Sequence, residues 1–584
     1  MVPYQVRRLL QLRWCQPSPD RKTQLDKRTE DGDYSSSIFL RDINHRVLNI
    51  CLFPPLFFFS VLYYTDVLSA SCVLATYIVF LQRRQKIDAP REAQGVVHES
   101  NDPASWFQAC FRAGYFAQKP WLIDIELCAL GLYALLFRQT NIFWVAIFLA
   151  GLEIIRVVKP NGTTSWEGED TSFSGLIRGG WYHGMIYDPL VREACIEGKL
   201  PLHLHRSSCL TQSSTADYLK TAISLTVGTA ANLNVVLAFL IPYIFLLTAF
   251  GGFVLWNGGV VLGKRMNALP SQTLANPFQG HKEFHTVSIH LPQMLYIWPN
   301  FMFFSFPLIY PYLLNSVVPQ SLLPSFLRFG SIRHRLPRPI VSIVALGLMS
   351  LTVHYNTIVH PFTLADNRHY VFYIFRILLR HPSIKYLAVP VYFLCAWGAI
   401  QALGGISDRD GNASPVSPNQ TPSKAKSTGN KHNAKRQTTS PKPTHPRNPE
   451  DQSNRTSFVL IYLLTTTFSL ITAPLVEPRY FIIPWLIWRV HVPVVHRSPL
   501  TPPAKSAKTS PHNVRIAPAT ATMDSPRLWL DNIRDVAYRK HDHRLWLETL
   551  WVLLVNAATC YLFLYWGFEW PSEEERGRVQ RFMW

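Results

Sequence analysis

Long apolar blocks constrain this chain more than any other feature of its sequence. About eleven blocks of about 17–22 residues recur along it, each long enough to cross a bilayer core as a helix. A helix satisfies its own backbone hydrogen bonds, which lipid cannot do. The blocks therefore predict an all-α, polytopic membrane protein with about 11 transmembrane helices. They lie near 46–64, 66–81, 121–137, 141–158, 235–256, 294–313, 339–358, 384–403, 457–476, 479–495 and 549–568.

Composition supports a membrane protein. The chain is 48% hydrophobic and only 16% charged, whereas a soluble protein has about 25% charged residues. Its net charge of +20 would also suit a nucleic-acid binder, but the basic residues lie mostly between the apolar blocks. We therefore expect contact with membrane lipid and no nucleic-acid partner.

The distribution of Lys and Arg predicts an orientation, because cytoplasmic loops are enriched in these residues. The loops at about 82–120, 159–234, 314–338, 404–456 and 496–548 are assigned to the cytoplasm, and the loop at 404–456 is rich enough in Ser, Pro, Lys and Asn to be disordered. The predicted segments are a basic polar cytoplasmic segment at 1–45, helices with luminal catalytic turns at 46–403, a disordered cytoplasmic loop at 404–456, a transmembrane hairpin at 457–495, a cytoplasmic loop at 496–548, and a last helix with a luminal C-terminus at 549–584.

Three glycosylation sequons fall in loops that this topology assigns to the cytoplasm. Glycans are added on the luminal side, so we expect all three to be unmodified. They begin at Asn161, Asn412 and Asn454.

Short polar turns fall together on the opposite, luminal or extracellular face. They contain the residues that we expect to form one composite site. Asp366, Asn367, Arg368, His369 and Tyr370 are consecutive, and the other turns contribute Asp66, Arg138, Asn257, Glu477 and Arg479.

Each of these residues also has a purely structural interpretation. Arg368 and His369 suit a phosphate, because a guanidinium offers a fork of donors; equally, they suit lipid headgroups or helix ends at the membrane surface. Arg479 can form a local ion pair with Glu477, and Arg138 can cap a helix C-terminus. Asn257 precedes two glycines and suits a turn. No motif for a metal, a nucleotide or a serine nucleophile is present.

Five motifs in the right order resemble the dolichyl-phosphate-glucose α-1,2-glucosyltransferase family. That family adds the last glucose to the lipid-linked oligosaccharide of N-glycan assembly. The similarity runs from about residue 46 to the end, interrupted by the polar loops. The motifs are FRQTNI at 137–142, NGGVVLG at 257–263, LADNRHYVFY at 364–373, EPRYFIIPWLIWR at 477–489 and VQRFMW at 579–584.

The resemblance implies a GT-C-type enzyme of the endoplasmic reticulum membrane with a luminal active site. Its donor would be dolichyl phosphate glucose and its acceptor a diglucosylated oligosaccharide on dolichyl diphosphate. The reaction would invert the anomeric carbon without a cofactor or metal, using a carboxylate base. By motif position, Arg368, His369 and Arg479 would bind the donor phosphate. Substrate-site candidates are Arg138, Asn257, Asn367, Tyr370 and Glu477.

One family feature is missing from this sequence. Family members carry an Asp-Glu pair followed by Phe-His in a first luminal loop, and no DExFH string occurs here. The hypothesis that follows is an N-terminally truncated chain. If the chain is instead complete, Asp366 or Asp66 would serve as the base. Two alternatives stay open: an inactive relative that binds dolichyl lipids or partner membrane proteins, and a transporter or scramblase, which the scarcity of charges in the apolar blocks disfavours.

Overall fold

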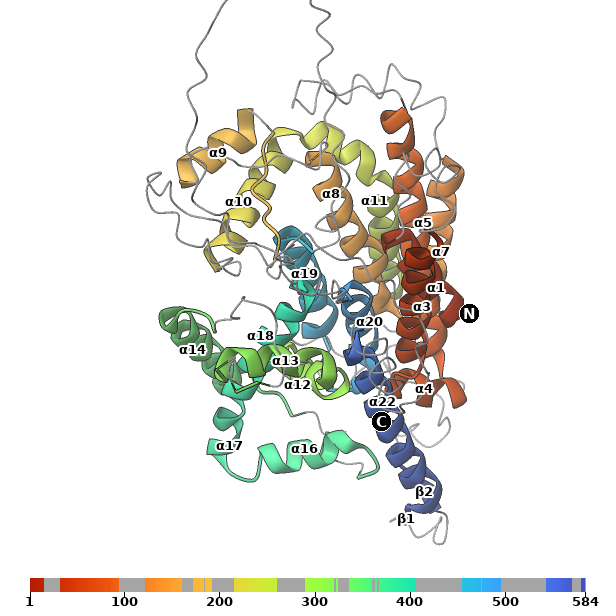
Figure 1. Ribbon diagram of the computed structural model, residues 1–584, viewed down its shortest axis with the longest axis vertical. Coiled ribbons are helices and arrows are strands. Elements are labelled where there is room, and N and C mark those ends of the chain that lie inside the picture. Colours follow the sequence, from red (N-terminus) through yellow and green to blue (C-terminus); the bar gives the residue numbers. More distant parts are fainter. Residues whose placement is uncertain are drawn as a thin grey trace, which may run out of the picture.

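The computed structural model supports an all-α architecture (Figure 1). Its helices are α1 (Val2–Trp14), α3 (Gly32–Cys51), α4 (Pro54–Val61), α5 (Thr65–Ala93), α7 (Trp121–Phe137), η1 (Gln139–Asn141), η2 (Phe143–Phe148), α8 (Leu149–Val158), α9 (Phe173–Tyr182), α10 (Thr215–Ala231), α11 (Leu233–Asn257), α12 (Gln293–Phe304), α13 (Phe306–Val317), α14 (Pro339–Asn356), α16 (Tyr370–Leu378), α17 (Pro382–Leu387), α18 (Val389–Gly404), α19 (Thr456–Ile471), η8 (Pro478–Phe481), α20 (Ile482–His491) and α22 (His543–Tyr565). One antiparallel pair of short strands, β1 (Gly567–Glu569) and β2 (Val579–Arg581), follows α22.

The structure describes most, but not all, of the chain. The described residues are 1–14, 32–62, 64–93, 121–159, 172–182, 184–191, 215–259, 289–319, 322–323, 336–359, 363–364, 367–405, 454–473, 475–494, 542–569 and 579–582. Most of the predicted loop at 404–456 and most of that at 496–548 lie outside them.

Within these ranges, six helices are long and apolar enough to cross a membrane, and a shorter apolar helix spans Thr456–Ile471. The predicted count of about 11 spans stays a prediction. The six are Thr65–Lys86, Gln139–Val158, Leu233–Asn257, Pro339–Asn356, Pro382–Gly404 and His543–Tyr565.

Prolines divide two of the predicted spans. The span expected at 294–313 is two helices, because Pro307 has no N–H to donate to the carbonyl of Phe303. That carbonyl instead accepts a 2.6 Å hydrogen bond from the indole of Trp551. The span expected at 46–64 is likewise divided, with α3 ending at Cys51 and α4 beginning at Pro54.

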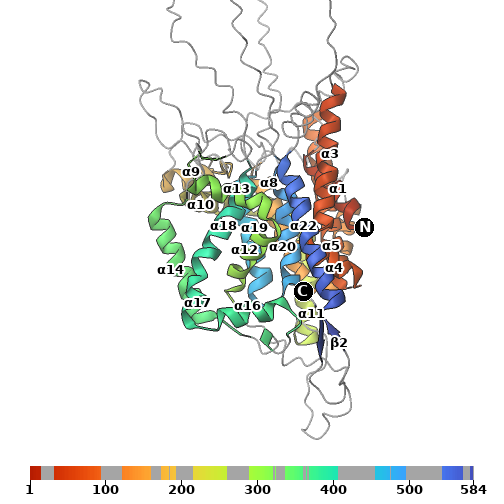
Figure 2. The same cartoon turned by 60° about the horizontal axis from the view of Figure 1, so that its bottom comes forward.

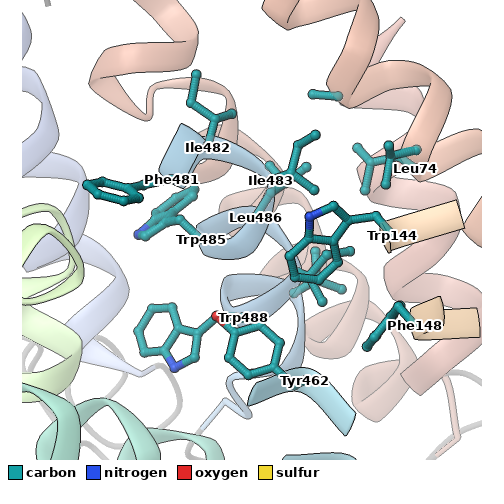
Figure 3. Close-up of a cluster of buried hydrophobic side chains, with 14 of the residues drawn as sticks. Leu74, Trp144, Phe148, Tyr462, Phe481, Ile482, Ile483, Trp485, Leu486 and Trp488 are labelled. Atoms are coloured by element: carbon teal, nitrogen blue, oxygen red, sulfur yellow. The ribbon is translucent and has the colours of Figure 1, made fainter. Parts of the chain in front are cut away.

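A dense apolar core surrounds α20, every residue of which is buried. Figure 3 shows Trp488 of this helix beside Tyr462 of α19, and Trp485 beside Phe481. The ring of Trp485 stacks on Phe53 at 3.7 Å between centroids, and its indole donates to Ser305 at 2.9 Å. Since α20 is held on all sides, the turn that precedes it is held in place as well.

Several charged residues in or next to the apolar helices are paired with one another. Arg489 of α20 and Glu548 of α22 lie 2.6 Å apart, each 1% exposed. Arg83 of α5 donates to Asp124 of α7 and to Glu153 of α8 at 2.6 and 2.9 Å. Pairing offsets the large cost of holding such charges away from water.

Helix α1 lies within the segment 1–45 that the sequence predicts to be basic, polar and cytoplasmic. Its residues Val2, Val6, Leu9 and Leu10 are buried and join the main apolar core. The helix packs against α3 and α5. Its four apolar residues lie on one face at helical spacing, which is why a segment with several Arg residues still enters the core.

Candidate functional site

An antiparallel pair of helices brings Asp66 and Arg138 together. The start of α5 lies beside the end of α7, and Arg83 and Asp124 join the opposite ends of the same two helices. Asp66 lies in the first turn of α5, and Arg138 follows the last residue of α7. Their side chains form an ion pair, with Arg138 Nη2 2.5 Å from Asp66 Oδ1.

A buried amide close to this ion pair in the sequence joins the same two helices, α5 and α7. Asn141 donates to Ser69, one turn after Asp66, at 2.8 Å, and to the carbonyl of Ala134 at 2.8 Å. The next residues form a π-helical segment, Phe143–Phe148. Such segments often occur at functional sites, where they change the direction of neighbouring side chains. Here the irregular segment follows Arg138 within five residues.

The turn before α20 contributes a second ion pair to the same cluster. Glu477 and Arg479 are joined through the Arg Nε atom. Both arginines lie over the ring of Tyr480: the guanidinium carbon of Arg138 is 5.6 Å from the ring centroid and that of Arg479 is 5.8 Å from it. The Tyr480 side chain is also hydrogen-bonded to Glu477. We call Asp66, Arg138, Glu477, Arg479 and Tyr480 the two-arginine cluster.

Burial within the cluster is uneven. The side chains of Asp66 and Arg138 are 3% and 15% exposed, whereas those of Glu477 and Arg479 are 21% and 35% exposed. Burial lowers the pKa of Arg138 from its usual value, and the nearby Asp66 carboxylate opposes that shift. Asp66 Oδ2 is buried and has no hydrogen-bond partner among the described residues. The inner pair is therefore fixed, and the outer pair is open to exchange.

The structure places the other predicted residues elsewhere or does not describe them. Asn367, Arg368 and His369 immediately precede α16, and Tyr370, the first residue of that helix, is hydrogen-bonded to Asn300 of α12. Asn257 ends α11 and donates to the carbonyl of Gly259 at 2.8 Å. Gly258 between them has φ of 66°, as the predicted turn requires. Asp366 lies outside the described residues.

The end of the bundle that carries these turns is recognisable in Figure 2. The turn between α4 and α5, helix α16 and strand β2 lie toward the bottom of that view. Sequence reasoning missed Tyr480, Ser69 and Asn141. The signal for two of them was present, since Asn141 belongs to FRQTN and Tyr480 to EPRYF, but neither residue is charged.

Helices of membrane-crossing length with two paired arginines at one end define a polytopic membrane protein, and the more exposed of these arginines, Arg479, is suited to bind an anionic ligand. The chain belongs to the DIE2/ALG10 family of membrane glycosyltransferases, whose model matches residues 19–490. That result confirms the family resemblance drawn from the motifs.

Curated relatives extend over nearly the whole chain. The Dol-P-Glc:Glc(2)Man(9)GlcNAc(2)-PP-Dol alpha-1,2-glucosyltransferases of Aspergillus fumigatus and Emericella nidulans are each 39% identical to it, over 93% of this chain and 78% of the relative. The Homo sapiens protein of the same name is 24% identical over 92% of this chain and 72% of its own length. No solved structure matches the chain.

Proposed function

We propose that this protein transfers glucose in α-1,2 linkage from dolichyl phosphate glucose to the diglucosylated oligosaccharide on dolichyl diphosphate. The single observation that carries the proposal for this chain is the two-arginine cluster. The relatives of this chain are named for the same activity. A phosphodiester is the part of the donor that two guanidinium groups recognise best.

Arg138 and Arg479 would bind the donor phosphate, and Arg479 is the more accessible of the two. Arg368 and His369 remain candidates for the same role from the start of α16. Of the two carboxylates predicted as the base, Asp66 is the one that the structure describes, and it belongs to the two-arginine cluster. Asp366 remains the alternative base.

The transfer would be a direct displacement at the anomeric carbon. The acceptor 2-hydroxyl oxygen forms a bond to C1 of glucose as the bond from C1 to the phosphate oxygen breaks. The electron pair of that bond leaves with dolichyl phosphate, and the hydroxyl proton passes to the carboxylate. The phosphate gains a negative charge during this step, so two neighbouring cations stabilise the transition state more than the bound donor.

We further infer that the cluster faces the lumen of the endoplasmic reticulum. The basic loops that are predicted to be cytoplasmic follow the helix ends that lie opposite to the two-arginine cluster. The relatives' names specify dolichyl-linked substrates, which are membrane lipids, and this chain has helices of membrane-crossing length.

Complementation tests the proposed function. The 584-residue chain would be expressed in cells that lack the last glucosyltransferase of lipid-linked oligosaccharide assembly, and the glucose content of the oligosaccharide would be measured. We expect restoration of the triglucosylated species. Accumulation of the diglucosylated species, with the protein present in the membrane at normal abundance, would refute activity of this chain and favour a dolichyl-lipid-binding relative.

A further inference from the structure

Two like charges held close together need a group that fixes their separation. Arg138 and Arg479 come from turns more than 300 residues apart in the chain, and each is within 6 Å of the centroid of the Tyr480 ring. Arg138 also forms an ion pair with Asp66, and Arg479 forms one with Glu477. Tyr480 is thus the only member of the two-arginine cluster that contacts both cations through its ring.

The carboxylates cannot keep both arginines in place once a phosphate binds. Arg479 and Glu477 form the more exposed pair, and a phosphodiester that approaches Arg479 competes with the Glu477 carboxylate for the same donors. A cation is attracted to the face of an aromatic ring through its charge. The contact between Arg479 and the Tyr480 ring therefore does not use the guanidinium N–H groups that donate to the carboxylate. It therefore persists when Arg479 changes its partner from carboxylate to phosphate.

We propose that Tyr480 is a positioning residue that holds Arg138 and Arg479 at one ring so that both reach the same phosphate of a polyprenyl phosphate sugar. This inference rests on the proposed function for its substrate class. The half-buried ring is fixed in turn, because its neighbour Phe481 is buried in the apolar core (Figure 3).

The charge on the phosphate gives the inference a specific signature. The donor is a phosphodiester with one negative charge, whereas the product dolichyl phosphate is a monoester that carries more charge near neutral pH. Two aligned cations favour the more highly charged ligand. Loss of alignment should therefore weaken product binding more than donor binding, an outcome that general damage to the fold would not produce.

The test is Tyr480→Leu compared with Tyr480→Phe in the full-length protein reconstituted in nanodiscs. We expect Tyr480→Leu to raise the inhibition constant of dolichyl phosphate about tenfold and the donor KM about threefold, in line with a partly desolvated cation–ring contact. Tyr480→Phe keeps the ring and should leave both constants within about twofold of wild type. The acceptor KM should not change. Tyr182→Leu, at a side chain 76% exposed on α9, is the matched control.

Equal increases in the inhibition constant of dolichyl phosphate and in the donor KM would overturn the inference. So would increases in Tyr480→Phe as large as those in Tyr480→Leu. The second result would assign the effect to the hydroxyl rather than the ring. A separate measurement keeps this test independent of turnover: the rise in thermal unfolding temperature that dolichyl phosphate produces. If the wild-type chain transfers no glucose, the proposed function fails. Even then, a smaller rise in unfolding temperature with dolichyl phosphate for Tyr480→Leu than for Tyr480→Phe supports the positioning role. Equal rises in unfolding temperature for the two variants refute it.

Discussion

Replacing Asp66 by Asn separates two roles for this carboxylate. The change removes one negative charge but keeps the size of the side chain and an oxygen that accepts from Arg138, 2.5 Å away. A general base contributes about 10²–10⁴-fold to the rate. A hydrogen bond between charged groups contributes about 1.5–3 kcal/mol, which corresponds to about ten- to a hundredfold in affinity. The role of Asp66 therefore decides which kinetic constant changes.

Steady-state kinetics of the purified enzyme in nanodiscs measure the difference, with the donor and the acceptor varied in turn. If Asp66 is the base, Asp66→Asn lowers kcat at least about 100-fold, and the acidic limb of the pH–rate profile disappears. The donor KM then changes little. If Asp66 only orients Arg138, the donor KM rises and kcat keeps most of its value.

Glu477→Gln is the matched control, since it also neutralises the carboxylate partner of an arginine. Glu477 and Arg479 are more exposed than the inner pair, so this change should affect either constant less than Asp66→Asn does. Asp366→Asn tests the other predicted base. Values of kcat and donor KM within about twofold of wild type in Asp66→Asn would refute both roles and remove Asp66 from the mechanism.

Three further predictions concern stability and processing. Glu548→Gln should destabilise the protein by about 3–5 kcal/mol because it leaves buried Arg489 without its carboxylate; an unchanged thermal unfolding temperature would contradict this. Asp188→Ala should loosen the start of α19, where Asp188 accepts from the backbone N–H of Ser457 at 3.0 Å, at a cost of about 1–2 kcal/mol measurable as faster proteolysis near that residue. Asn454 is buried and hydrogen-bonded to two backbone carbonyls, so digestion with an endoglycosidase should not change the mass of its peptide.

The positions of most helices could be predicted from hydropathy, because a spanning helix must be apolar over its own length whatever surrounds it. The block predicted at 121–137 is α7 with the same bounds, and the block at 141–158 ends where α8 ends. The proximity of Asp66 and Arg138 also follows from the order of the helices: two consecutive spans run antiparallel, so the start of one lies beside the end of the other.

The partners of charged groups could not be predicted in the same way. Hydropathy treats one helix at a time, whereas the contact between Arg489 and Glu548 depends on how two helices rotate about their axes. The burial of α1 depends on its packing against α3 and α5. Tyr480 was missed for a related reason: its importance comes from two arginines in distant turns that approach its ring.

Exposure distinguishes the ion pairs that hold this fold together from the pair that is suited to bind a ligand. Arg489 and Glu548 are each 1% exposed and satisfy each other through two hydrogen bonds, so exchange of either partner would leave a buried charge uncompensated. Arg479 is 35% exposed and loses much less when it exchanges a carboxylate for a phosphate. One Arg–Glu pair, near the end of α20, therefore has a structural role. The other, just before the start of α20, can exchange its carboxylate for a ligand. That contrast, rather than the number of charges, is the physical reason to locate phosphate binding at the two-arginine cluster.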